Sequence, residues 1–143
     1  MKLNGIYTAL ITPFNDDYSI NEKAYAEVIN KIIEEGVHGI VVAGSTGENY
    51  AQTLEERLYL LKLSSEIIDK RVTFIAGTGG VIRTEDSILI AQSAKSNGAD
   101  AIMISSPPYA VPTSKENAIN AIAIEQSVNL PVLLYNYPGR TSV

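Results

Sequence analysis

The chain has 143 residues, a formal net charge of −5 and no cysteine. This length fits one domain over residues 1–143 without an internal boundary, and the acidic balance argues against a nucleic-acid or anionic-membrane partner. Without cysteine there is no disulfide framework, thiolate nucleophile or cysteine-ligated metal. Residues Met1–Gly5 lack the apolar run of a signal peptide, and no stretch approaches the ~20 apolar residues of a membrane span, so we expect a cytoplasmic protein.

Five apolar segments have the length and composition of β-strands. They are residues 6–12, 39–43, 72–76, 101–104 and 132–135. Amphipathic helical segments separate them, and hydroxyl residues stand where amino-terminal helix caps are expected, at Ser19, Thr53, Thr84 and Ser114. The unit of strand, loop and helix recurs about every thirty residues, the size of a βαβ repeat. This alternation predicts an α/β fold with a parallel sheet whose strand carboxyl ends share one edge.

Two architectures fit this pattern. One is an open, doubly wound sheet of five strands. The other is an incomplete (β/α)₈ barrel of the TIM-barrel type, with its first five strands and four helices, because a whole barrel normally needs ~250 residues. Periodicity alone does not choose between them. In either one, the fourth helical segment is expected to bury Ala118 and Ile122.

The segment from Ile40 to Glu48 is the most distinctive in the chain. Four apolar residues predict a strand buried on both faces, and Gly44-Ser45-Thr46-Gly47-Glu48 comes directly after them. A glycine-rich loop at the carboxyl end of a parallel strand can direct N–H groups and hydroxyls toward a carboxylate or phosphate. Alternatively, the loop is a tight turn in which Ser45 and Thr46 bond to their own backbone.

Hydroxyl groups dominate the shared carboxyl edge of the predicted sheet. They come from Thr12, Ser45, Thr46, Thr78, Ser105, Tyr109 and Tyr135, and Arg140 stands just beyond the last strand. Hydroxyls with one cation suit proton relay and hydrogen bonding to a carboxylate and a carbonyl, and they do not form a metal site. The one histidine, His38, precedes the second strand and is expected at the opposite edge, which argues against a nucleophilic triad. We therefore expect no metal and no cofactor.

Five motifs resemble those of the dihydrodipicolinate synthase/N-acetylneuraminate lyase family. They are residues 9–14 (Ala-Leu-Ile-Thr-Pro-Phe), 44–48 (Gly-Ser-Thr-Gly-Glu), 75–79 (Ile-Ala-Gly-Thr-Gly), 107–109 (Pro-Pro-Tyr) and 135–141 (Tyr-Asn-Tyr-Pro-Gly-Arg-Thr). Each motif is weak alone, but together they span the chain in the family's order and spacing. The resemblance implies the barrel architecture. It also implies a class I lyase that acts through a Schiff base on pyruvate, or another 2-oxo acid, and on a second small molecule.

The resemblance implies roles for individual residues. Ser45, Thr46 and Gly47 would bind the pyruvate carboxylate. Tyr135 would be the acid/base that relays protons at the imine carbon. Ser45 would link Tyr135 to Tyr109, which in synthases of this family reaches in from a neighbouring subunit of a homo-oligomer, a dimer or tetramer.

The family pattern also assigns a role to the segment after the fifth strand. Arg140 would hold the carboxylate of the second substrate, a bidentate task suited to guanidinium. Ser45-Thr46 is the lyase form of the hydroxyl pair, whereas Gly139-Arg140-Thr141 is the synthase form, so the subfamily and the reaction direction stay open. The family's Schiff-base lysine lies on its sixth strand, and this chain stops at Val143, just past the fifth.

None of the chain's own lysines stands inside an apolar strand. They are Lys2, Lys23, Lys31, Lys62, Lys70, Lys95 and Lys115. Imine chemistry needs a desolvated amine, so we expect the chain to be inactive alone. An incomplete barrel would leave its first and fifth strands as open edges, so we also expect the chain to be part of a longer protein or to be completed by another chain. Two other functions stay open: a non-catalytic half barrel that keeps the Ser45/Thr46 carboxylate site, and a flavodoxin-like phosphate or nucleotide binder that uses Gly44–Glu48.

Overall fold

The computed structural model describes residues 3–141, with side chains described through Gly139. Its strands are β1 (Tyr7–Ala9), β2 (Gly39–Val42), β3 (Thr73–Gly77), β4 (Ala101–Ser105) and β5 (Val132–Tyr135). Its helices are α1 (Glu22–Glu34), the 3₁₀ turn η1 (Ser45–Gly47), α2 (Leu54–Ile68), α3 (Thr84–Ser96), α4 (Ser114–Val128) and the single turn α5 (Pro138–Thr141). The predicted strands and the four long helices are all present. β1 is shorter than predicted, and α5 was not predicted.

The strands form one parallel sheet in the order β1-β2-β3-β4-β5. The register places Ile40 beside Phe74 and Ile102 beside Val132. In a flavodoxin-like sheet β1 would lie between β2 and β3, so the observed order excludes that alternative. Sequential parallel strands form the wall of a (β/α)₈ barrel, and this sheet is the first five strands of such a wall.

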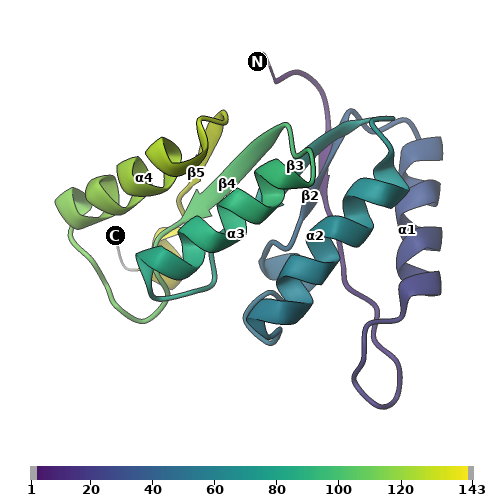
Figure 1. Cartoon of the computed structure of the whole chain (residues 1–143), viewed down its shortest axis with the longest axis horizontal. Coiled ribbons are helices and arrows are strands. Elements are labelled where there is room, and N and C mark those ends of the chain that lie inside the picture. The colour runs from purple at the N-terminus through teal and green to yellow at the C-terminus, as the bar shows by residue number, and fades with distance from the viewer. Residues whose placement is uncertain (1–2, 142–143) are drawn as a thin grey trace.

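The long helices pack on one face of the sheet. Figure 1 shows α2 and α3 in front of the strands, with α1 and α4 at either side. Alternate strand residues join the apolar residues of these helices in the larger core, namely Ile40, Val42, Phe74, Ala76, Ile102 and Ile104. The strand residues between them form a second, smaller cluster on the other face, which contains Tyr7, Val41, Ile75, Ala101, Met103 and Leu133. This second face corresponds to the interior of a barrel.

Two of the predicted helix caps are those of α2 and α4. Thr53 caps α2 as predicted, in a capping box with Glu56. Ser114 does not cap α4, because it is the first residue of that helix and its neighbour Thr113 forms the capping box with Glu116.

The predicted caps at Ser19 and Thr84 are also wrong. Asn21 caps α1, where its Oδ1 accepts a 2.9 Å hydrogen bond from the N–H of Ala24. Thr84 is already inside α3, and its Oγ1 donates to Oδ1 of Asn120 in α4 at 2.8 Å. Several capping residues stand near each helix start, so residue type alone does not fix which one caps.

The buried side of α4 differs from the prediction. Ile124 and Val128 are buried, whereas Ala118 is exposed and Ile122 is 54% exposed. The apolar residues of α4 are spread over more than one stripe, and the sequence pattern selected the wrong one. In the described part of the chain β5 is an edge strand, and its Leu134 is also exposed.

Candidate functional site

A cavity of about 300 Å³ lies at the carboxyl edge of the sheet, on the face opposite the long helices. It is lined by Tyr7, Ala9, Val41, Ala43, Gly44, Ser45, Thr46, Asn49, Tyr50, Gly77, Gly79, Gly80, Met103, Ser105, Ser106, Pro108, Tyr135 and Tyr137. The lining combines apolar residues with the hydroxyl groups of serine, threonine and tyrosine side chains. A cavity of this size holds a small organic molecule, and the hydroxyls can orient a polar head group.

The loop after β2 places two hydroxyl residues at this cavity. Gly44 has an extended backbone (φ −80°, ψ −179°), and Ser45 and Thr46 begin the 3₁₀ turn that comes next. Both side chains are exposed, and both residues line the cavity. The first N–H groups of a helical turn have no carbonyl of the same turn to bond, so they remain available to an acceptor. The prediction that this loop offers donors at the carboxyl edge therefore agrees with its geometry.

The end of the same loop is fixed by side chains that do not enter the cavity. Thr12 Oγ1 donates to the Gly47 carbonyl at 2.8 Å, and Gln52 Nε2 donates to that carbonyl at 2.7 Å. Thr12 is buried and does not line the cavity. Thr12 therefore reaches the carboxyl edge as predicted, but its hydroxyl holds the loop and does not line the cavity. Gly47 itself is buried behind Ser45 and Thr46.

Two residues at the other side of the cavity come from neighbouring strands. Ser105 and Tyr135 are register partners at the carboxyl ends of β4 and β5, and both line the cavity. Tyr135 is 48% exposed, so its ring is not buried in the core. Thr78 does not join them, because it is fully buried and its Oγ1 donates to the Met103 carbonyl at 3.4 Å.

The two remaining predicted site residues lie outside this cavity or outside the described side chains. Tyr109 is 95% exposed, has a left-handed backbone (φ 68°) and does not line the cavity. Arg140 belongs to the turn α5, and its side chain lies outside the described residues. The structure thus brings Ser45, Thr46 and Tyr135 to one cavity and leaves Tyr109 exposed outside it.

Two residues that support the cavity, Asn49 and Arg57, were not predicted from the sequence. Asn49 lines the cavity, and both residues donate hydrogen bonds to the loop after β3. Arg57 gave a signal in the sequence, because it lies on the same helical face as Leu54, Leu58 and Leu61. A cation on an apolar stripe indicates a buried partner, whereas Asn49 had no such signal.

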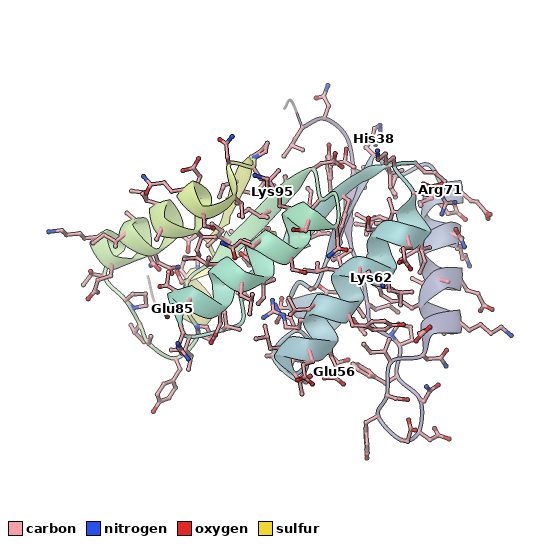
Figure 2. All side chains as sticks on the ribbon, viewed as in Figure 1. His38, Glu56, Lys62, Arg71, Glu85 and Lys95 are labelled. Atoms are coloured by element: carbon pink, nitrogen blue, oxygen red, sulfur yellow. The ribbon has the colours of Figure 1, made fainter. Side chains whose placement is uncertain are left out.

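Among the described side chains, no charged residue lines the cavity itself. His38 accepts a 3.1 Å hydrogen bond at Nδ1 from the Ile6 N–H, and Figure 2 places it at the opposite end of the sheet from Glu56 and Glu85. This confirms the prediction for His38. No metal-binding group of His, Cys, Asp or Glu occurs among the described residues, and none of their helices could cross a membrane.

The lysines with described side chains are all exposed, and none lines the cavity. They are Lys23, Lys31, Lys62, Lys70, Lys95 and Lys115, whereas Lys2 lies outside the described residues. Figure 2 shows Lys62 and Lys95 on α2 and α3, on the side of the sheet that the helices cover. Within residues 3–139 the cavity therefore has hydroxyls and backbone N–H groups but no amine.

Comparison with known proteins gives one consistent result. The sequence model of the dihydrodipicolinate synthetase family matches residues 2–143. The 4-hydroxy-tetrahydrodipicolinate synthase of Bartonella quintana is 38% identical over 141 residues, which are 99% of this chain and 48% of that protein. The chain therefore spans about half the length of the curated relatives it matches.

Solved structures agree with the sequence comparison. The 4-hydroxy-tetrahydrodipicolinate synthase of Methylacidiphilum fumariolicum superimposes with a TM-score of 0.94 at 37% identity, over 99% of this chain and 47% of that one. The chloride-inhibited dihydrodipicolinate synthase of Acinetobacter baumannii, solved in complex with pyruvate, gives a TM-score of 0.94 at 35% identity, over 99% and 48% of the two chains.

Proposed function

The chain belongs to the dihydrodipicolinate synthetase family, and we propose that it is the amino-terminal part of a pyruvate-dependent lyase that works through a Schiff base. One observation carries the proposal: Ser45, Thr46 and Tyr135 line the same cavity at the carboxyl edge of the sheet. In (β/α)₈ barrel enzymes this edge carries the active site. A similar synthase has been solved with pyruvate bound.

Ser45 and Thr46 bind the carboxylate of pyruvate or of another 2-oxo acid in this proposal. Their hydroxyls are exposed at the cavity, and they begin the turn η1, where N–H groups lack partners within the turn. Hydrogen bonds to a charged carboxylate are stronger than those between neutral groups. Gly47 supports this arrangement from behind, through the carbonyl that Thr12 and Gln52 hold.

Tyr135 acts as the acid/base that moves protons at the imine carbon. Tyr135 ends β5 beside its register partner Ser105, is half-exposed and lines the cavity. Ser45 relays the proton between Tyr135 and a Tyr109 that enters from a neighbouring subunit. The exposure of Tyr109 and its absence from its own cavity support this relay and a homo-oligomer, a dimer or tetramer.

The second substrate and the Schiff-base lysine both involve positions near or beyond the end of this chain. Arg140 holds the carboxylate of the second substrate. We place the protein in the cytoplasm. The amine that captures pyruvate belongs to a strand beyond Val143 in the complete protein. All lysines with described side chains are exposed, and a solvated lysine is too protonated to attack a carbonyl efficiently.

Reduction with borohydride in the presence of pyruvate tests this proposal. A protein that extends past the fifth strand should be trapped covalently, and its mass should rise by that of a reduced pyruvyl group. The 143-residue chain should not be trapped. Trapping of this chain alone, for instance at Lys115, would contradict the proposal that its amine lies further along the sequence.

The other candidate is a binding half barrel without catalysis. The lack of any described lysine at the cavity favours it for the 143-residue chain by itself. Borohydride trapping combined with a pyruvate titration distinguishes the two, because a binding module would bind pyruvate reversibly and would never be trapped covalently. A complete protein that binds pyruvate but is never trapped would therefore be a binding module and not a lyase.

A further inference from the structure

One buried amide connects the two loops that form the cavity. Asn49 Nδ2 donates to the Ala43 carbonyl at 2.9 Å and to the Gly79 carbonyl at 3.4 Å. Ala43 follows β2 in a left-handed conformation (φ 55°) and directly precedes Gly44 and the hydroxyl pair. Gly79 belongs to the loop after β3. A single side chain therefore joins the backbone before Ser45 to the opposite loop.

Arg57 strengthens the same connection from the helix layer. Its Nη2 donates to the Gly77 carbonyl at 3.2 Å and to the Gly79 carbonyl at 2.7 Å, so Gly79 accepts from both Asn49 and Arg57. The side chain of Arg57 is 1% exposed. Burial lowers the pKa of Arg57 to about 10, so the guanidinium remains charged at neutral pH.

Arg57 is an energetically unfavourable residue for filling space in a core. Among the described residues its Nε and Nη1 have no hydrogen-bond partner, although both atoms are buried. Burying a charge with unpaired donors is unfavourable compared with an apolar residue of similar volume. The two hydrogen bonds to loop carbonyls, rather than packing alone, account for a guanidinium at this position.

The two loops also touch directly, without room for adjustment. A Cβ on Gly77 would lie 2.5 Å from the Ala43 carbonyl oxygen. A Cβ on Gly80, whose φ is +82°, would lie 2.9 Å from Cγ of Asn49. Close packing of this kind transmits a shift of one loop to the other.

We infer that Asn49 and Arg57 are positioning residues, which hold the loop Gly77–Gly80 against Ala43 and thereby set the position of Ser45 and Thr46 in the cavity. Neither residue needs to touch the substrate for this role. The effect on pyruvate binding rests on the proposed function, whereas the connection between the loops does not. The two parts can therefore be tested separately.

The test uses the 143-residue chain and compares Asn49→Ala with Asn97→Ala. Asn97 is a matched control, because its Nδ2 donates two hydrogen bonds within the carboxyl end of α3, to the carbonyl and hydroxyl of Ser93. Amide hydrogen exchange is followed at Gly47 and Thr78, whose N–H groups bond to the carbonyls of Gly44 and Met103. Pyruvate affinity is measured on the same samples by titration.

Asn49→Ala should speed amide exchange at Gly47 and Thr78 by about tenfold and leave exchange unchanged at Asn129, the residue that follows α4. Asn97→Ala should leave exchange at all three amides unchanged. Asn49→Ala should also weaken pyruvate binding by about fivefold or more. A uniform increase in exchange over the whole chain, or none, would overturn the inference. If the wild-type chain binds no pyruvate, the proposed function fails while the exchange data still decide the connection between the loops.

Arg57 provides a second variant in case Asn49→Ala does not fold. Arg57→Lys keeps the charge but replaces the guanidinium, whose Nη2 donates both hydrogen bonds, by a shorter side chain with one ammonium group. It should therefore speed exchange at Thr78 less than Arg57→Leu does. Equal exchange in Arg57→Lys, Arg57→Leu and wild type would show that Arg57 does not hold the loop. Pyruvate affinity should change in the same order as loop exchange.

Discussion

Thr12 and Gly47 are joined by a hydrogen bond of 2.8 Å from the Thr12 hydroxyl to the Gly47 carbonyl, across 35 positions of sequence. This bond ties the end of the first predicted strand segment to the loop that presents Ser45 and Thr46. Gly47 packs so closely behind that bond that a Cβ would lie 2.9 Å from the Leu10 carbonyl oxygen and 3.1 Å from Thr12 Oγ1. The loop is therefore held in place at Gly47, which has no side chain, while Ser45 and Thr46 face the cavity.

Gly47→Ala should destabilise the protein. The new methyl group meets the backbone carbonyl of Leu10, which follows β1 and whose N–H bonds to the Val41 carbonyl, so the free energy of unfolding should fall by about 1–3 kcal/mol. Gly44→Ala is the control in the same loop, because its Cβ would have only Met103 Cε nearby, at 3.8 Å. Urea denaturation should place Gly44→Ala within about 0.5 kcal/mol of wild type. Equal losses for both variants would contradict the packing argument.

Gly79 and Ser105 should be coupled energetically. A Cβ on Gly79 would lie 2.0 Å from Ser105 Oγ and 3.1 Å from Ser105 Cβ. Gly79→Ala should therefore reduce the free energy of unfolding by about 1 kcal/mol or more, and Ser105→Ala alone should have little effect. In the double variant the loss should be smaller than the sum by at least about 0.5 kcal/mol, and strict additivity in denaturation experiments would refute the contact.

Tyr25 should make stability depend on alkaline pH. Its hydroxyl lies 2.7 Å from Ser64 Oγ, and Ser64 donates its own proton to the Leu60 carbonyl, so Tyr25 is the donor. Burial raises the pKa of Tyr25, which means that only the unfolded chain loses this proton just above its ordinary value of about 10. The contribution of Tyr25 to the free energy of unfolding is therefore fully present below about pH 10. Above that pH it falls by up to about 1.4 kcal/mol for each pH unit.

Tyr25→Phe separates this effect from those of other groups, including Arg57, which remain in both proteins. At about pH 8 the variant should be less stable than wild type by about 1 kcal/mol, because one buried hydrogen bond is lost. By about pH 11 the difference should shrink to zero or reverse. Urea denaturation at both values provides the measurement, and a difference that stays constant with pH would disprove a buried, neutral Tyr25.

Tyr135→Phe in the complete enzyme should lower turnover by ~10²–10⁴-fold while pyruvate is still bound. The hydroxyl that relays the proton is removed, but Ser45 and Thr46 remain. Arg140→Ala is the matched variant, since it should weaken the second substrate and leave borohydride trapping of pyruvate intact. Steady-state kinetics with trapping on each variant checks both, and wild-type turnover in Tyr135→Phe would reject the proton-relay assignment.

Much of the fold can be predicted from local pattern. Apolar runs such as Gly39–Val42 mark the strands, and the parallel arrangement brings their carboxyl ends to one edge. Strand order cannot be predicted from periodicity, because an open sheet and a barrel wall use the same repeat. The motif resemblance favoured the barrel wall, and the sequential sheet agrees.

The site was predicted less completely than the fold. Ser45, Thr46 and Tyr135 meet at the cavity because each follows or ends a strand. Thr12 and Thr78 do not, since their hydroxyls bond to carbonyls of distant residues, which no local pattern reveals. Asn49 escaped prediction for the same reason, because the partners of a buried polar side chain are set by tertiary packing. The place of Arg57 on an apolar helical face indicated its burial but not the carbonyls to which it donates.

The central claim is that the Ser45/Thr46 loop binds the carboxylate of pyruvate. Titration of the isotopically labelled 143-residue chain with pyruvate, monitored through the backbone amide resonances, tests it most directly. The account predicts saturable shifts at Ser45 and Thr46, which Ser45→Ala weakens and Asn97→Ala leaves unchanged. Saturable shifts confined to another part of the chain, or no shift at these two amides at any pyruvate concentration, would contradict it.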